Sequence, residues 1–381
     1  MRPQFHIFLG TMAEFIKILP VIRSFEARSI PYKLILSGQN PVKAQEIWRF
    51  IEKKNADIIL SEGPKKQTAW SLIQWFLGTL TSHLFGQGRI KLGIEKNDYI
   101  LIHGDTISTL MGAILGKICG AKICHIEAGL RSFHYFRPFP EEISRILVSR
   151  ISEYSYCPNS WSSENLTGRK TNKINTKANT LMDSLQMVLN DSQKFETPNL
   201  PDDYFVFVCH RQENLMDKAF LEKLMHQIIE KSKNIHCLFV LHAPTKMALK
   251  DINLLDTVES LSTITTVPRL SYPSFVHTLK ESRFIITDGG SNQEESYYLG
   301  KPCLVLRSET ERIEGLDHNV VLSRRCPQTI ESFFKNPYLW QKDPQEFSVS
   351  PSEIILDSLE KIASSAPQKK FKKELQLKTS A

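Results

Sequence analysis

The chain has few of the features that mark secreted or metal-binding proteins. Its seven cysteines are scattered and include no CxxC pair, which argues against a disulfide framework and against a zinc site built from cysteine pairs. This usage predicts a reducing compartment. The first residues, MRPQFHIFLG, have neither the long apolar core nor the small-residue cleavage site of a signal peptide. We therefore expect a cytoplasmic protein.

Long apolar runs are also missing. The most apolar stretch, residues 70–85 (WSLIQWFLGTLTSHLF), is interrupted by Gln74, Thr79, Thr81 and His83. It is also shorter than the roughly 20 apolar residues that a bilayer-spanning helix needs. The sequence therefore predicts no transmembrane segment and favours a buried or interface helix at this position.

No GxGxxG motif follows the first predicted strand, residues 4–9, which argues against a dinucleotide cofactor clamped in the usual way. The turn at Gly10 and Thr11 instead leads directly into a helix. The backbone N–H groups and the positive end of that helix would face an anion. We predict an anion-binding turn here and no cofactor.

The length of the chain indicates how many domains it forms, and its net charge indicates which classes of ligand it can bind. With 381 residues and 41% hydrophobic residues, it is long for one core and normal for two domains. A net charge of +7 suits an anionic ligand such as a nucleotide diphosphate, and would suit nucleic acid equally well. Part of this charge lies in Lys369, Lys370, Lys372 and Lys373, which we interpret as a solvated tail, with contact to anionic lipid as the alternative.

Short apolar runs alternate with helical segments in both halves of the chain. Strands are predicted at 4–9, 33–37, 57–60, 99–103, 122–126 and 155–158, and again at 204–209, 237–241, 261–266, 283–287 and 302–306. Residues 85–96 are expected to form a surface excursion. The pattern predicts an α/β fold of two doubly wound, Rossmann-like domains facing a cleft. We place the domains at 1–196 and 197–350, with a helix at about 351–366 joining the first domain and a basic tail at 367–381.

Three carboxylates mark the loops of the first half. Asp105 and Glu127 follow two predicted strands, and Glu141 begins a helix in which Arg145 lies one turn further on. Because the carboxyl ends of parallel strands meet at one edge of a sheet, these groups are expected to converge. Such a cluster requires a cation or a protonated member. The plainer alternatives are a helix cap for Asp105, a solvated loop residue for Glu127 and an ordinary helical ion pair for Glu141 and Arg145.

In the second half of the chain, two predicted strands are also followed directly by residues that could bind a ligand. His210 closes the strand at 204–209 and should emerge at the cleft. Residues 288–291 (DGGS) form a second turn before a helix, in which Gly289 and Gly290 allow the backbone to approach a ligand closely. We therefore predict a second anion-binding turn at the cleft.

Six motifs carry a resemblance to a known family. They are HGDT (103–106), HIEAGLRS (125–132), PFPEEISR (138–145), HRQEN (210–214), TDGGSNQEE (287–295) and GKPCLVLRSETERIEG (300–315). In this order and spacing they resemble the UDP-N-acetylglucosamine 2-epimerase family, and its non-hydrolysing branch more closely than its hydrolysing one. The resemblance implies a fold of the GT-B type and an isomerase of polysaccharide biosynthesis that interconverts UDP-N-acetylglucosamine and UDP-N-acetylmannosamine, or a close UDP-2-acetamido sugar. It implies elimination and re-addition of UDP without metal or redox cofactor. We also expect a homodimer and no nucleic-acid partner.

The resemblance also implies roles for individual residues. Asp105, Glu127 and Glu141 would supply the acid and base, with His210 assisting at the diphosphate or in proton transfer. The residues expected to bind substrate are Gly10, Thr11, Lys17, Gln39, Arg145, Arg211, Phe275 beside the uracil, Gly289, Gly290, Ser291, Glu295 at the ribose, and Arg312 at the nucleotide.

The chain departs from the family pattern at the first turn. Met12, in GTMAE, stands where the family has an arginine that holds the diphosphate, and Asn40 stands where it usually has histidine. We expect Lys17, Arg211 and Arg137 to carry the missing charge. These departures keep open a sugar-nucleotide binding protein without turnover. Two other enzymes also remain alternatives: a hydrolysing epimerase that releases the free sugar and UDP, and a glycosyltransferase of the same architecture.

Overall fold

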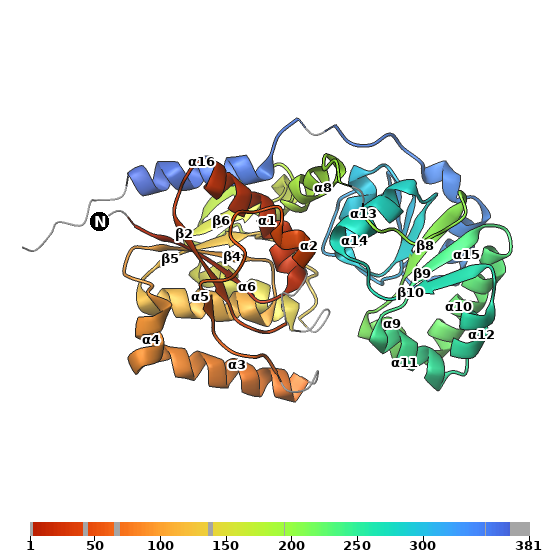
Figure 1. The fold of residues 1–381 in the computed structure, drawn as a ribbon, viewed down its shortest axis with the longest axis horizontal. Coiled ribbons are helices and arrows are strands. Elements are labelled where there is room, and N and C mark those ends of the chain that lie inside the picture. The colour runs from red at the N-terminus through yellow and green to blue at the C-terminus, as the bar shows by residue number, and fades with distance from the viewer. Residues whose placement is uncertain are drawn as a thin grey trace, which may run out of the picture.

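A computed structural model describes residues 3–40, 45–64, 69–135, 140–193, 195–346 and 348–365. It contains two parallel sheets that lie side by side, each covered by helices (Figure 1). The predicted α/β fold with two doubly wound sheets is therefore confirmed. The domain boundaries at 196 and 350 remain a prediction.

The first sheet has the order β3-β2-β1-β4-β5-β6-β7, with all neighbours parallel. Its central strands are apolar and fully buried because helices cover both faces. The strands are β1 (Phe5–Leu9), β2 (Tyr32–Leu36), β3 (Ile58–Ile59), β4 (Tyr99–His103), β5 (Lys122–Ile126), β6 (Tyr154–Cys157) and β7 (Asn172–Asn175). The helices are α1 (Met12–Ala27), α2 (Gln45–Trp48), α3 (Ala69–Leu84), α4 (Gly86–Leu92), α5 (Ile107–Cys119), α6 (Glu141–Ile151), α7 (Ser160–Glu164) and α8 (Leu181–Leu189).

The second sheet has the order β10-β9-β8-β11-β12-β13, again with parallel neighbours. Its strands are β8 (Tyr204–Val208), β9 (His236–Val240), β10 (Ile264–Val267), β11 (Ile285–Thr287), β12 (Cys303–Val305) and β13 (Val320–Leu322). Its helices are α9 (Gln212–Leu215), α10 (Lys218–Ser232), α11 (Ala243–Asp251), α12 (Leu255–Ser260), α13 (Tyr272–Glu281), α14 (Gly290–Tyr298) and α15 (Pro327–Lys335), followed by the 3-10 helix η1 (Pro337–Trp340). We call the parts built on the two sheets the first and second lobes.

The last helix, α16 (Pro351–Ser364), returns to the first lobe, as predicted. Arg28 at the end of α1 forms ion pairs with Glu353, Asp357 and Glu360 along α16. Asp183 on α8 accepts hydrogen bonds from the Ser350 hydroxyl (3.0 Å) and from the Ser352 N–H (2.8 Å). The chain therefore crosses between the lobes a second time beside α8, close to the first crossing.

The differences from the predicted elements lie mostly at the edges of the sheets. The segment at 85–96 lies largely at the surface, as predicted, but residues 86–92 form a helix, α4, that was not predicted. The edge strands β7 and β13 were not predicted, since NKIN is polar and VVL is only three residues long. The predictions for Pro41, for Arg137 and for the tail beyond Pro367 fall outside the described residues.

The apolar stretch at 70–85 forms α3, which lies on one face of the first lobe. Its Trp75 and Leu80 are buried against the core, whereas Trp70 and Leu77 are exposed. No helix within the described ranges is long and apolar enough to cross a membrane. All seven cysteines are free, and six of them are buried.

Candidate active site

A cavity of about 710 Å³ lies between the lobes. It is lined by residues that follow the carboxyl ends of strands in both sheets, where doubly wound folds place their ligands. All but two of the predicted site residues line it; these are Thr11, Lys17, Asp105, Glu127, Glu141, Arg145, His210, Arg211, Phe275, Gly289, Gly290, Ser291, Glu295 and Arg312. The two exceptions are Gly10 and Gln39. No cluster of three or more His, Cys, Asp or Glu residues suited to a metal ion occurs in the described parts of the chain.

The turn before α1 already binds a carboxylate of its own. Glu14 Oε2 accepts hydrogen bonds from the N–H groups of Gly10 (2.6 Å) and Thr11 (2.9 Å). We predicted that these N–H groups would face a ligand, and in this structure they face Glu14. Burial raises the pKa of Glu14 in spite of its hydrogen bonds. Glu14 Oε1 also accepts from Thr106 and Thr109, so it ties α1 to the loop that carries Asp105.

Gln39 has a packing role of the same kind. Its side-chain oxygen accepts hydrogen bonds from the N–H (3.2 Å) and hydroxyl (2.7 Å) of Ser108 at the start of α5. The Gln39 carbonyl is therefore turned towards α5, and the residue does not line the cavity.

Glu127 is the centre of a buried ion cluster between the lobes. Its Oε1 accepts from Lys17 Nζ (2.6 Å), Asn179 Nδ2 (2.5 Å) and Arg312 Nη2 (2.8 Å). Burial acts to raise the pKa of Glu127, but Arg312 and Lys17 outweigh it and hold that pKa well below its usual range. The φ of Glu127 is 63°, which is uncommon for a residue with a side chain. Gly104, in the loop after β4, leaves room for the Glu127 carboxylate, because a Cβ at this glycine would lie 3.1 Å from Glu127 Oε2.

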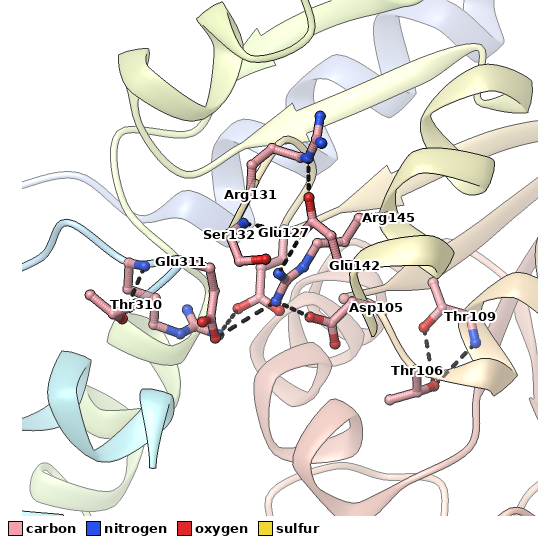
Figure 2. A network of polar contacts seen from close by, with 12 residues as sticks. Asp105, Thr106, Thr109, Glu127, Arg131, Ser132, Glu142, Arg145, Thr310 and Glu311 are labelled. Carbon is pink, nitrogen blue, oxygen red and sulfur yellow. Dashed lines mark hydrogen bonds and ion pairs between the residues drawn. The ribbon is translucent and has the colours of Figure 1, made fainter. Parts of the chain in front are cut away.

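Asp105 and Glu141 lie in contrasting surroundings. Asp105 forms an ion pair with Arg145, which also pairs with Glu142 (3.0 Å) and Glu311 (3.6 Å) (Figure 2). The helical partner of Arg145 is thus Glu142 rather than Glu141. Glu141 Oε2 is buried and has no hydrogen-bond partner among the residues that the structure describes. Burial and the charge of Asp105 raise the pKa of Glu141.

The second lobe brings its own carboxylates to the cavity. Glu295, on the first turns of α14, accepts a hydrogen bond from Asn292 (2.9 Å), and burial raises its pKa to about 7. The neighbouring Glu294 pairs with Arg312, yet burial raises its pKa to about 8. Arg312 thus stands between Glu294 of its own lobe and Glu127 of the other.

Several residues at the site escaped the sequence analysis, which singled out residues that follow strands and belong to motifs. Asp288 belongs to the predicted turn, but its contacts with His210 were not foreseen. Asn179 and Glu294 were missed because only their packing reveals their partners, whereas Glu14 was missed although its spacing from Thr11 is that of a capping box. His103 lines the cavity 3.8 Å from Glu127, and neither of its ring nitrogens has a hydrogen-bond partner among the described residues. Burial lowers its pKa to about 3, so it is neutral.

Comparison with known proteins gives a consistent result. A family model described as UDP-N-acetylglucosamine 2-epimerase matches residues 33–339. A curated UDP-N-acetylglucosamine 2-epimerase of Methanocaldococcus jannaschii is 32% identical over 325 residues, which cover 82% of this chain and 85% of that protein.

Two solved structures resemble the whole fold. A crystal structure of the UDP-GlcNAc 2-epimerase of M. jannaschii, in complex with UDP-GlcNAc and UDP, has a TM-score of 0.77 and 27% identity, covering 94% of this chain and 99% of that one. The Neisseria meningitidis enzyme bound to UDP-GlcNAc has a TM-score of 0.80 and 26% identity, with 94% and 100% covered. The family match spans most of the sequence and includes the motifs that line the cavity. The chain therefore belongs to the UDP-N-acetylglucosamine 2-epimerase family.

Proposed function

We propose that the chain interconverts UDP-N-acetylglucosamine and UDP-N-acetylmannosamine, or a close pair of UDP-2-acetamido sugars, without net hydrolysis. The observation that carries the proposal is the contrast between two carboxylates in one cavity. Glu141 has a raised pKa, and its Oε2 has no hydrogen-bond partner within the described ranges of the chain, whereas Glu127 is held ionised by Arg312 and Lys17. Pairs of titratable groups with separated pKa values are typical of acid–base sites.

The proposed reaction removes the C2 proton and breaks the bond between C1 and the UDP oxygen, whose electron pair leaves with UDP. The products are a 2-acetamidoglucal and UDP. Re-addition forms the C1–O bond again and places a proton on the opposite face of C2. We assign proton transfer to Glu141 and Asp105, whose side chains share one end of the cavity.

Glu127 has a different role in this proposal. Three donors already occupy its Oε1, and two of them are cations: Lys17, which was expected near the diphosphate, and Arg312, which was expected at the nucleotide. We propose that Glu127 holds these cations in place. Arg211, whose nearest carboxylate is 4.0 Å away on Glu311, and Arg269, which also lines the cavity, then supply the charge that Met12 lacks.

The product formed from UDP-N-acetylglucosamine in deuterated water tests the proposed function. We expect both UDP-sugar epimers to acquire deuterium at C2, because the proton that returns comes from solvent-exchanged carboxyl groups. Proton NMR of the reaction mixture measures this directly. Free N-acetylmannosamine with stoichiometric UDP would indicate the hydrolysing activity instead. Absence of exchange with any UDP-hexosamine would favour binding without turnover.

A homodimer is part of the proposal, and the outer face of α3 supports it. Trp70, Ile73 and Leu77 are exposed there by 68%, 40% and 51%. Figure 1 shows α3 on the side of the first lobe away from its sheet. The helix contains no Asp, Glu, Lys or Arg. Because a two-fold axis places the same patch on both copies, an uncharged apolar face can pair with itself without opposing like charges.

Leu77→Glu should convert the dimer to a monomer, since it would place two carboxylates in an apolar interface. Light scattering after size-exclusion chromatography measures the mass. Met247→Glu is the matched control, because Met247 is 70% exposed on α11 of the other lobe, and it should leave the dimer intact. A monomeric wild type, or a dimeric Leu77→Glu protein, would contradict this interface.

A further inference from the structure

His210 is hydrogen-bonded to a buried carboxylate, that of Asp288, which does not itself line the cavity. Asp288, at the end of β11, is fully buried, and its carboxylate accepts the backbone N–H of His210 (2.9 Å) and of Arg211 (2.9 Å) and the side-chain N–H of Asn214 (3.1 Å). These bonds attach the segment after β8 to the turn after β11. The backbone position of His210 is therefore set by Asp288.

The same carboxylate also faces the imidazole ring. His210 Nδ1 lies 3.0 Å from Asp288 Oδ1, at an angle that does not form a hydrogen bond. Burial acts to raise the pKa of Asp288, but its contacts with His210 outweigh it and lower that pKa, so the group facing the ring is a carboxylate.

A second histidine packs on the face of this ring. The rings of His210 and His242 are stacked, with centroids 5.0 Å apart and planes inclined by 28°. Burial, the nearby His210 and Arg269 together lower the pKa of His242 to about 4. His242 is therefore neutral near pH 7, and it can support the ring of His210 without repelling a positive charge on it.

The contacts of the His210 ring with Asp288 and His242 leave only one of its nitrogens, Nε2, free to act on a ligand. Nδ1 faces Asp288 and one ring face is covered by His242, while the residue lines the cavity. Nε2 is then the ring nitrogen available to a ligand. A carboxylate behind one ring nitrogen fixes the tautomer and stabilises the imidazolium, so that the other nitrogen acts as a donor of fixed direction.

We propose that Asp288 and His242 are positioning residues, which hold His210 with Nε2 directed at the oxygen of the departing diphosphate. Asp288 stabilises the charged ring, and His242 fixes its plane. Asp288 does not line the cavity, and His242, which does, acts through the ring of His210. The inference rests on the proposed function, because it gives His210 the diphosphate as its partner.

A double-mutant cycle separates this role from a structural one. Asp288→Asn keeps an oxygen that can accept the backbone N–H groups and removes the charge behind Nδ1. We expect kcat to fall by about 10–100-fold, the loss that follows from removing one charge-assisted hydrogen bond, while KM stays within about twofold. In a His210→Gln background, Asp288→Asn should lower kcat no further, because the effects of substitutions at residues that act as a unit are not additive.

Two controls accompany the cycle. Asp98→Asn is matched in chemistry, since Asp98 is also buried, accepts the backbone N–H of Gln4 and faces the ring of His6, but lies before β4 and outside the cavity; it should leave kcat unchanged. His242→Phe preserves a stacked ring and should retain most of the activity that His242→Ala loses. An Asp288→Asn effect that persists at full size in the His210→Gln background would overturn the proposal.

Imidazole nitrogen NMR of the UDP-bound protein gives a readout that does not depend on turnover. We expect the wild type to show a protonated Nδ1 on His210, and Asp288→Asn to change the tautomer or the charge of that ring. Identical His210 signals in the two proteins would overturn the positioning role. A wild type without C2 exchange, but with the expected change in the NMR signals, would place the error in the proposed reaction instead.

Discussion

Replacing Glu141 by glutamine should lower kcat by about 10²–10⁴-fold and leave the protein at least as stable as the wild type. The side chain keeps its shape but can no longer transfer a proton. Its Oε2 is buried and has no hydrogen-bond partner in the described part of the chain, and burial and the charge of Asp105 raise its pKa. A carboxyl whose pKa is raised on folding costs stability above its ordinary pKa of 4.5, and this cost disappears as the pH falls below that value. The melting temperature of the variant should therefore match or exceed that of the wild type at pH 7, with the gap closing near pH 4.

The neighbouring residue provides the matched control. Glu142 is fully buried, and its carboxylate pairs with Arg131 (2.5 Å) and Arg145 (3.0 Å). Glu142→Gln should therefore destabilise the fold by up to about 3–5 kcal/mol, because Arg131 loses the carboxylate it pairs with and the buried Arg145 loses one of its three. Calorimetry and initial rates on both variants measure the contrast. If Glu141→Gln melts far below the wild type, Glu141 has a structural role and another group transfers the proton.

Arg312→Met should cost about 3–5 kcal/mol of unfolding free energy and weaken UDP binding as well. The guanidinium is buried between Glu127 and Glu294, and its removal leaves a buried ionised Glu127 with Lys17 as its remaining cation. Urea unfolding measures the stability, and titration calorimetry with UDP measures the binding. Adding Glu127→Gln to Arg312→Met should recover part of the stability, because the unpaired charge is then gone.

A surface arginine shows what the loss of an ordinary ion pair costs. Arg283 pairs with Asp203, and their side chains are 50% and 68% exposed. Arg283→Met should change the stability by no more than about 1 kcal/mol. If Arg312→Met is equally mild, water must reach the cluster around Glu127, and the two lobes do not depend on that cluster.

The sequence was most informative where local pattern and local structure coincide. The strands at 99–103 and 122–126 were predicted with the bounds that β4 and β5 show, because each is an apolar run that ends at a polar loop. Asp105 and Glu127 follow these strands and reach the cavity for the same reason. By contrast, α4 was missed because three glycines obscure its pattern, although Gly93, in a left-handed conformation, caps its end.

The site was harder to predict wherever a group has a choice of partners. Arg312 and Glu127 are 185 residues apart, and no pattern in the chain selects this pair from the many possible ones. The N–H groups of the first turn were expected to bind a ligand, but Glu14 lies three residues after Thr11 and closes a capping box on them. That signal is local and was available: Thr11 followed by Glu14 has the spacing of a capping box. The contacts of His210 with Asp288 and His242 could not be predicted, because they arise from tertiary packing alone.

The two crossings of the chain between the lobes limit how the enzyme can open. The first runs from α8 to β8, and the second enters α16, where Ser350 and Ser352 bond to Asp183 on α8 itself. Two covalent connections fastened side by side act as a hinge with a single axis, so the lobes can swing about this side but can hardly slide or twist. Displacement in such a swing grows with distance from the axis. The loop with Glu311 and Arg312 would then separate from Arg145 and Glu127 in the same movement that admits the nucleotide sugar, so substrate entry and the exposure of these charges to water would be one event.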